Sequence, residues 1–176
     1  KQSLKAGIHP LDDGTLYAAR FSANGTGEWL PLTPDNPALA GWTIADILIN
    51  TRGAADLAGA TKMDRPEWID TFPDSLTAVA TLTNNTRRGT GTNPAVDAAN
   101  PRGPNPYGSV IQWSYRNDWT EPSFRWEQFA LAGDPAVGGS VVPVCGSIRT
   151  QSHRPSGRNP ASVQLLETRR RAAWSP

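Results

Sequence analysis

The sequence predicts an all-β fold with one helical insertion around residues 43–58. Short runs rich in β-branched and aromatic residues recur at fairly even spacing between residues 15 and 132, which is typical of a β-propeller or a β-sandwich. The 16 glycines and 16 prolines indicate many turns between short elements. One segment near residue 50 instead has the apolar spacing of an amphipathic helix. These observations disfavour an α/β sheet.

The first predicted elements are a hairpin and the helix. Asn24-Gly25 is a favoured two-residue hairpin turn, and it joins predicted strands at residues 15–23 and 28–32. Thr43 is a suitable N-cap for a helix over residues 44–57, which we expect to be interrupted or to end near Arg52-Gly53.

Four further strands are predicted, at residues 68–72, 76–83, 107–115 and 123–132. Turns at residues 73–75 and around Asn117-Asp118 join them in pairs. Residues 84–106 form a long polar loop, and loops of this length are commonly functional or disordered. At about 40–50 residues per propeller blade, the chain up to residue 136 corresponds to roughly three blades, whereas a closed ring needs about four. The sequence therefore predicts an incomplete propeller with open edge strands.

Composition and charge divide the chain into a folded domain and a tail. A mean hydropathy of −0.47 and the lack of a long apolar run predict no membrane insertion, and seven tryptophans can fill a core. Residues 1–145 carry a net charge of −4, whereas residues 146–176 carry six arginines, one acid and a net charge of +5. We interpret residues 1–136 as a partial β-propeller domain and residues 137–176 as a basic tail, disordered or frameshifted.

Several chemically interesting side chains carry no motif. Cys145 is a single thiol without a histidine at useful spacing, so an unreactive thiol is favoured over a nucleophile. His9 and His153 lack metal-ligand spacing. Arg169, Arg170 and Arg171 are adjacent but have no interleaved aromatic residues, so a solvated chain end is favoured over a nucleic-acid site. We predict no nucleic-acid partner, and the sequence does not determine the oligomeric state.

Arg65 and Glu67 are the first candidate site residues. They flank Pro66 at the start of a predicted strand, where residues two apart share one face of a sheet. An arginine offers a planar fork for phosphate or carboxylate, and a glutamate offers hard oxygen ligands for Ca²⁺ or iron. From spacing alone, an ion pair at the strand end is the alternative, and such surface pairs contribute little to stability.

The polar run of residues 83–88 is the second candidate. The carbonyl oxygens of Asn84 and Asn85 could bind a cation, and Arg87 and Arg88 could bind an anion. The alternative is an ordinary polar loop that begins with turn-forming asparagines.

Six longer sequence words occur in a fixed order: GTLYAARF (14–21), GTGEWLPL (25–32), ADILINTRGAADLAGATKMDRPEW (45–68), ATLTNN (80–85), ANPRGPNPYGSVIQW (99–113) and FALAGDP (129–135). In this order the sequence resembles the PhoX family of bacterial alkaline phosphatases, over roughly residues 3–135. The resemblance implies a fragment of a propeller of about six blades that hydrolyses phosphate monoesters at a calcium and iron cluster on its central axis.

The resemblance also implies roles for individual residues. In the family's Arg-Pro-Glu-Trp motif, the arginine contacts the phosphate and the glutamate ligates metal, and these positions are Arg65 and Glu67 here. Cys145 does not match the family's cysteine ligand, and the remaining ligands are expected outside residues 1–135. The family is typically exported by the twin-arginine route to the periplasm or the exterior. This chain begins at Lys1 without a signal peptide, so we expect an N-terminal piece to be missing and the fragment to be inactive alone.

Two other functions remain open at this point. One is a non-catalytic β-propeller segment that binds a partner through its open edges. The other is a calcium-dependent, lactonase-like propeller hydrolase, which would not use Arg65 to bind phosphate.

Overall fold

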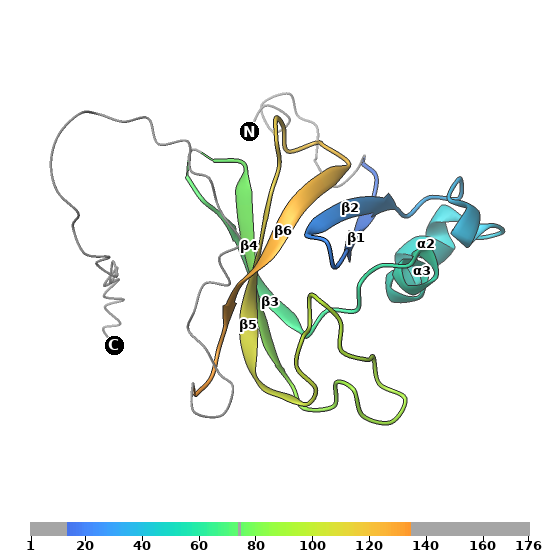
Figure 1. The fold of residues 1–176 in the computed structure, drawn as a ribbon. Helices are drawn as coiled ribbons and strands as arrows, with labels where there is room; N and C mark the ends of the chain where they lie inside the picture. Colours follow the sequence, from blue (N-terminus) through green and yellow to red (C-terminus); the bar gives the residue numbers. More distant parts are fainter. Residues whose placement is uncertain (1–13, 74, 135–176) are drawn as a thin grey trace, which may run out of the picture. The chain divides into compact units, whose positions relative to one another are not determined.

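The structure is a computed structural model that describes residues 14–73 and 75–134, and its strands form one curled antiparallel sheet (Figure 1). The sheet order is β1-β2-β6-β5-β4-β3. Its strands are β1 (Tyr17–Phe21), β2 (Thr26–Pro31), β3 (Pro66–Thr71), β4 (Thr77–Asn85), β5 (Asn105–Ser114) and β6 (Ser123–Leu131). The predicted all-β class and the helical insertion are confirmed, and the curled sheet is consistent with a partial propeller-like fold.

The sheet is assembled from a hairpin and a four-stranded meander. The hairpin pairs β1 with β2 around Asn24-Gly25, as predicted, with Gly25 at a φ of 78°. The Asn24 side-chain oxygen accepts hydrogen bonds from the backbone N–H and the hydroxyl of Thr26, at 3.0 and 2.6 Å. Strands β3 to β6 pair consecutively, and β6 then pairs with β2. One short β2–β6 ladder therefore joins the two parts of the sheet.

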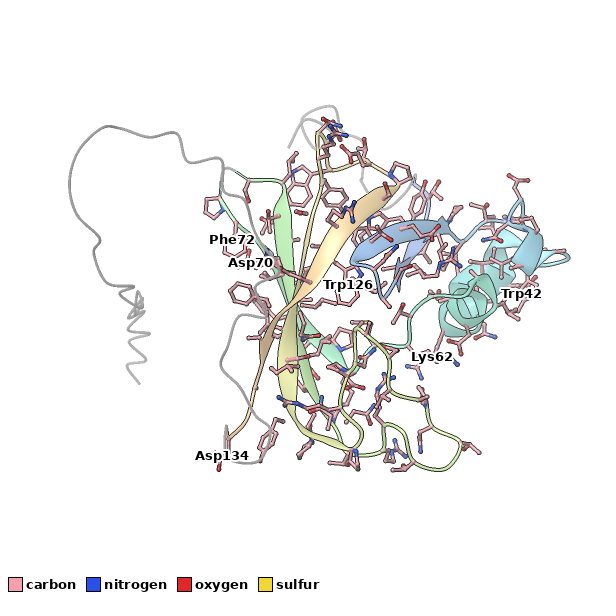
Figure 2. All side chains as sticks on the ribbon, viewed as in Figure 1. Trp42, Lys62, Asp70, Phe72, Trp126 and Asp134 are labelled. Carbon is pink, nitrogen blue, oxygen red and sulfur yellow. The ribbon has the colours of Figure 1, made fainter. Side chains whose placement is uncertain are left out.

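An aromatic cluster fills the main core. The Phe124 ring on β6 lies 5.3 Å from the rings of both Phe21 and Trp29. Figure 2 shows Trp126 near the middle of the sheet, where its indole N–H donates to the backbone of the β1–β2 turn. A Cβ atom at Gly27 would lie 2.0 Å from the Phe124 ring, so β2 needs a glycine opposite Phe124. Close aromatic packing thus stabilises the junction between hairpin and meander.

The helical insertion consists of two short helices beside the hairpin (Figure 1). Helix α2 (Ile44–Ile49) and helix α3 (Thr51–Ala58) follow the 3₁₀ turn η1 (Pro37–Leu39). Ile47 and Ala54 of these helices form a second core cluster with Leu32, which directly follows β2, and with Leu39 of η1. Thr43 caps α2 as predicted.

The position of the helix break corrects the prediction. The break lies at Asn50, not at Arg52-Gly53, which are helical residues of α3. Asn50 has φ −117° and ψ 50°, and its side-chain oxygen accepts a hydrogen bond from the Gly53 N–H at 3.1 Å. Because an asparagine side chain can satisfy a free N–H at a helix start, Asn50 ends one helix and caps the next.

The remaining predictions concern the long loop and the chain ends. The predicted long loop is present but is shorter than 84–106: residues 86–104 connect β4 to β5 without a strand or helix, and the two residues at each end of the predicted loop belong to the strands. Neither helix among the described residues is long and apolar enough to cross a membrane. The predicted tail at 137–176, with Cys145 and the arginines at 169–171, lies outside the described residues, as do His9 and His153.

Candidate functional site

The candidate site lies where the segment after α3 enters β3, and Arg65 is its most unusual residue. Arg65 has a φ of 41°, and it is the one non-glycine residue with positive φ in the described part of the chain. Its backbone is held on both sides: its N–H donates to the Met63 carbonyl at 3.1 Å, and its carbonyl accepts from the Thr83 N–H at 3.1 Å. A left-handed conformation costs a residue with a side chain roughly 1–2 kcal/mol.

The guanidinium group of Arg65 is exposed and only partly engaged. Its Nη1 donates to the backbone oxygen and the side-chain oxygen of Asn84, at 3.4 and 3.3 Å. Its Nε and Nη2 atoms donate to no described residue. The contact with Asn84 orients the group, and the remaining N–H donors are available to an anion. A guanidinium with free donors can bind two oxygens of a phosphate at once.

Glu67 lies on a β-bulge. Pro66 pairs with Leu82 and Trp68 pairs with Thr81, so Glu67 is the extra residue on β3. Strand alternation, which predicts a shared face for Arg65 and Glu67, therefore does not apply: Arg65 precedes the strand in a left-handed conformation, and the bulge interrupts the alternation. The two residues form no ion pair in the structure, so the strand-end pair is not the explanation for this motif.

The Glu67 carboxylate is exposed and has no hydrogen-bond or ion-pair partner among the described residues. It is a free oxygen donor of the kind that Ca²⁺ or iron would take. However, Ca²⁺ needs six to eight oxygens, and the described residues contain no group of three or more His, Cys, Asp or Glu side chains that could hold a metal. These residues alone do not complete a calcium or iron site.

A buried polar network lies directly before Arg65. Asp64 is 1% exposed, and its carboxylate accepts from Arg88 Nε at 2.5 Å, Asn85 Nδ2 at 2.8 Å and Asn105 Nδ2 at 3.2 Å. Its backbone N–H donates to the side chain of Asn100 at 2.8 Å. All these contacts are between residues that are distant in sequence, so the network ties the start of β3 to β4, β5 and the 86–104 loop.

Arg88 is the other centre of this network. It is also 1% exposed, and it donates to the backbone oxygens of Lys62 and Ala95. The carboxylate of Asp97 lies 3.7 Å from its Nη1. Removing one partner of a buried ion pair typically costs about 3–5 kcal/mol, because the other charge is left uncompensated. The Asp64–Arg88 pair therefore resists any movement of the segment that carries Arg65.

The residues of the second candidate, 83–88, have different contacts and do not form one site. Asn84 contacts Arg65, whereas the side chains of Asn85 and Arg88 are used inside the buried network. Arg88 is therefore not available to an external anion, and Arg87 is exposed in the loop that follows.

Sequence reasoning missed the structural role of Asp64 and Arg88. Both lie close to the stretches that it singled out, since Asp64 precedes Arg65 and Arg88 ends the 83–88 run. An acid and an arginine beside candidate site residues are a weak indication of a supporting pair, but their pairing across 24 residues is visible only in the fold.

Two hollows on the described surface are lined by other residues. One of about 480 Å³ lies at the opposite end of β3, between the β3–β4 turn and Trp119. The other, of about 340 Å³, lies beside α2 and includes Trp42 and Asp46. Neither is lined by Arg65 or Glu67. In Figure 2, Phe72 marks the region of the first hollow and Trp42 that of the second.

Comparison with known proteins identifies the family. Residues 3–155 match the model of the family described as alkaline phosphatase PhoX. Among solved structures, the chain is similar to Pseudomonas fluorescens PhoX in complex with vanadate, a transition-state analogue, with 40% sequence identity and a TM-score of 0.66. That match covers 77% of this chain and 25% of the other, so this chain spans about a quarter of that protein. No curated protein matches it. The family match, which extends over most of the chain, shows that this chain belongs to the PhoX family of alkaline phosphatases.

Proposed function

We propose that this chain is part of a metal-dependent phosphatase that hydrolyses phosphate monoesters, and that it supplies the phosphate-binding arginine, Arg65. The observation that carries the proposal is an exposed guanidinium with free donors on a strained backbone, within a chain of the PhoX family. Strained backbone conformations cluster at functional sites, where the surrounding structure maintains them. The similar Pseudomonas fluorescens protein, which binds vanadate, supports an oxyanion as the ligand.

Arg65 would act by orienting the phosphate and by stabilising charge. Its free Nε and Nη2 donors can face two oxygens of the phosphoryl group in one plane. During phosphoryl transfer, charge is spread over the equatorial oxygens, and a fixed guanidinium stabilises that distribution without reorganising. The contact of Nη1 with Asn84 leaves these donors unobstructed while it limits rotation of the group.

Glu67 is proposed as one ligand of the metal centre. The family resemblance supports calcium and iron as the metals, and the exposed, unpaired carboxylate of Glu67 suits either. The other ligands must come from outside the described residues. For this reason the 176-residue chain alone is expected to have negligible phosphatase activity. Export by the twin-arginine route is also part of the proposal, and it rests on the resemblance alone.

Vanadate binding tests the role of Arg65 without requiring turnover. Inorganic vanadate is titrated into the purified chain in the presence of Ca²⁺, and binding is followed by ⁵¹V NMR line broadening. Arg65→Ala should weaken binding by about tenfold or more, since a hydrogen bond to a charged group contributes about 1.5–3 kcal/mol. Arg52→Ala removes the same charge from an exposed position on α3 and should leave the affinity unchanged. Equal affinities of the wild type and Arg65→Ala would contradict the proposal.

Turnover of p-nitrophenyl phosphate tests the expected inactivity of the chain alone. Activity that chelation and Glu67→Gln both abolish would show that the chain carries a complete metal site, contrary to our expectation. Loss of Ca²⁺ binding in Glu67→Gln, measured by calorimetry, would instead support Glu67 as a ligand.

A non-catalytic binding segment is the second candidate function. It is favoured by strand β3, whose six residues are all exposed and which includes Trp68 and Ile69. Association that is independent of metal and of Arg65 would support this alternative.

A further inference from the structure

We propose that the buried pair Asp64–Arg88 is a positioning device that holds Arg65 in its left-handed conformation and so aims its guanidinium. The inference rests on the proposed phosphate-binding role of Arg65. Asp64 and Arg88 touch no substrate in this scheme, and they act through the backbone of Arg65.

The backbone strain at Arg65 favours relaxation to another conformation. A φ of 41° is unfavourable for a residue with a Cβ atom, and an exposed arginine gains nothing from packing that would compensate. Relaxation to negative φ would change the direction of the chain between Asp64 and Pro66. Something on at least one side of Arg65 must therefore oppose that change.

The start of β3 resists a change in the backbone of Arg65. Pro66 has a ring-restricted φ, and it pairs with Leu82 on β4. The Arg65 carbonyl is bonded to the Thr83 N–H. A change at Arg65 would therefore have to displace the residue on its other side, Asp64.

Asp64 is held in place by several hydrogen bonds and by a buried ion pair. Both carboxylate oxygens and the backbone N–H are bonded, and Arg88 Nε lies 2.5 Å from Oδ1 in a site with 1% exposure for both side chains. Moving Asp64 would break an ion pair where water cannot replace it, which is far more costly than the strain at Arg65. The pair thus outweighs the strain and maintains the φ of Arg65.

The first experiment measures the conformation of Arg65 directly. In the isotopically labelled full chain, the ³J(HN–Hα) coupling and the ¹³Cα and ¹³Cβ shifts of Arg65 report its φ. Asp64→Asn should move them toward values of negative φ. The matched control is Asp56→Asn, which removes the exposed ion pair between Asp56 on α3 and Lys62, and it should leave these values unchanged. Unchanged values in Asp64→Asn would overturn the proposal.

The second experiment separates positioning from stability. The double variant Asp64→Asn/Arg88→Met leaves no buried charge unpaired. This variant should therefore recover much of the stability that Asp64→Asn loses. It provides a folded protein for the measurement if the single variant unfolds. A purely structural role predicts wild-type vanadate affinity in this double variant. Positioning predicts about tenfold weaker vanadate binding, within the range of coupling for residues linked through a backbone shift, and a shifted Arg65 conformation.

The results distinguish this inference from the proposed function. If wild type and Arg65→Ala bind vanadate equally, the phosphate-binding role fails, and the NMR couplings still decide whether Asp64 holds the backbone of Arg65. If the couplings shift in the folded double variant while vanadate affinity stays at the wild-type value, the positioning inference is overturned and the function of Arg65 stands.

Discussion

Arg65 combines an unfavourable backbone conformation with a side chain that has unused hydrogen-bond donors. At a φ of 41°, glycine is free of the steric penalty that arginine bears. We therefore predict that Arg65→Gly is more stable than Arg65→Ala by about 1 kcal/mol, because only the glycine relieves the strain. Both variants lack the guanidinium and should bind vanadate equally weakly. Urea unfolding compares their stabilities, and the vanadate titration compares their binding.

Two further variants make this comparison specific. Asparagine tolerates left-handed φ better than alanine does, so Arg65→Asn should lie between the other two in stability. At Gly14, which has no positive φ and open space around it, an alanine substitution should not be destabilising. If Arg65→Ala proved as stable as Arg65→Gly, the backbone of Arg65 would not be under strain in solution.

The site residues were only partly predictable from sequence. Residue type and spacing identify Arg65 and Glu67 as candidates, because few side chains suit a phosphate or a hard cation. The bulge at Glu67 arises from the register in which β3 pairs with β4. The left-handed φ of Arg65 is held by contacts with residues distant in the sequence, so no local pattern encodes either feature. The Asp64–Arg88 pair could not be predicted from the sequence, because it depends on the path of the loop after β4 in the folded chain.

At the scale of elements, the start of helix α2 is set by a reciprocal cap. Thr43 and Asp46 form a capping box, in which the Asp46 carboxylate accepts from the Thr43 hydroxyl at 2.6 Å and from the Thr43 N–H at 2.8 Å. The hydroxyl bond, followed by the backbone bond, holds the pKa of Asp46 below its ordinary value of 3.8. The ionised form is thus favoured in the folded protein.

This lowered pKa predicts a pH-dependent contribution of the cap to stability. The contribution is fully present above the unfolded-state pKa, and it is lost as the pH falls through the lower folded-state pKa. The stability difference between wild type and Asp46→Asn should therefore be constant from pH 7 to about pH 5 and should shrink below about pH 4. Urea unfolding at a series of pH values measures this difference in the free energy of unfolding. In a Thr43→Val background the difference should be smaller at every pH, and an unchanged difference would show that the cap does not cause it.

The elements differ in how well the sequence predicts them. Asn24-Gly25 and the β-branched runs fix the hairpin and the strands through local chemistry, and each predicted strand is present within a few residues. The helix break was misplaced because Gly53 is a weaker helix former than most residues, which made it the obvious candidate. The structure keeps Gly53 helical and breaks the helix at Asn50, whose side chain provides the N-cap that glycine lacks.

For the molecule as a whole, the most consequential feature is the edge of the sheet at β3. Within the described residues β3 pairs only with β4, and Trp68, Ile69 and Phe72 on or beside it are 69%, 63% and 44% exposed. An exposed apolar edge strand offers unpaired backbone groups to any other chain. The count of blades in the sequence predicts open edges. The sheet order shows that these edges are β1 and β3 in the described part of the chain, and of the two only the β1 edge has backbone contacts to the segment at Thr61.

We predict that the isolated chain associates through this edge as its concentration rises. Ile69→Lys should abolish the concentration-dependent increase in average mass in sedimentation equilibrium, since a lysine on an edge strand opposes pairing with a second strand. Ile49→Lys makes the same substitution at the end of α2, where the isoleucine is 86% exposed, and should associate like the wild type. The edge hypothesis fails if Ile69→Lys associates as strongly as Ile49→Lys. If association is lost only in Ile69→Lys, β3 is the surface that other parts of a larger assembly would have to cover.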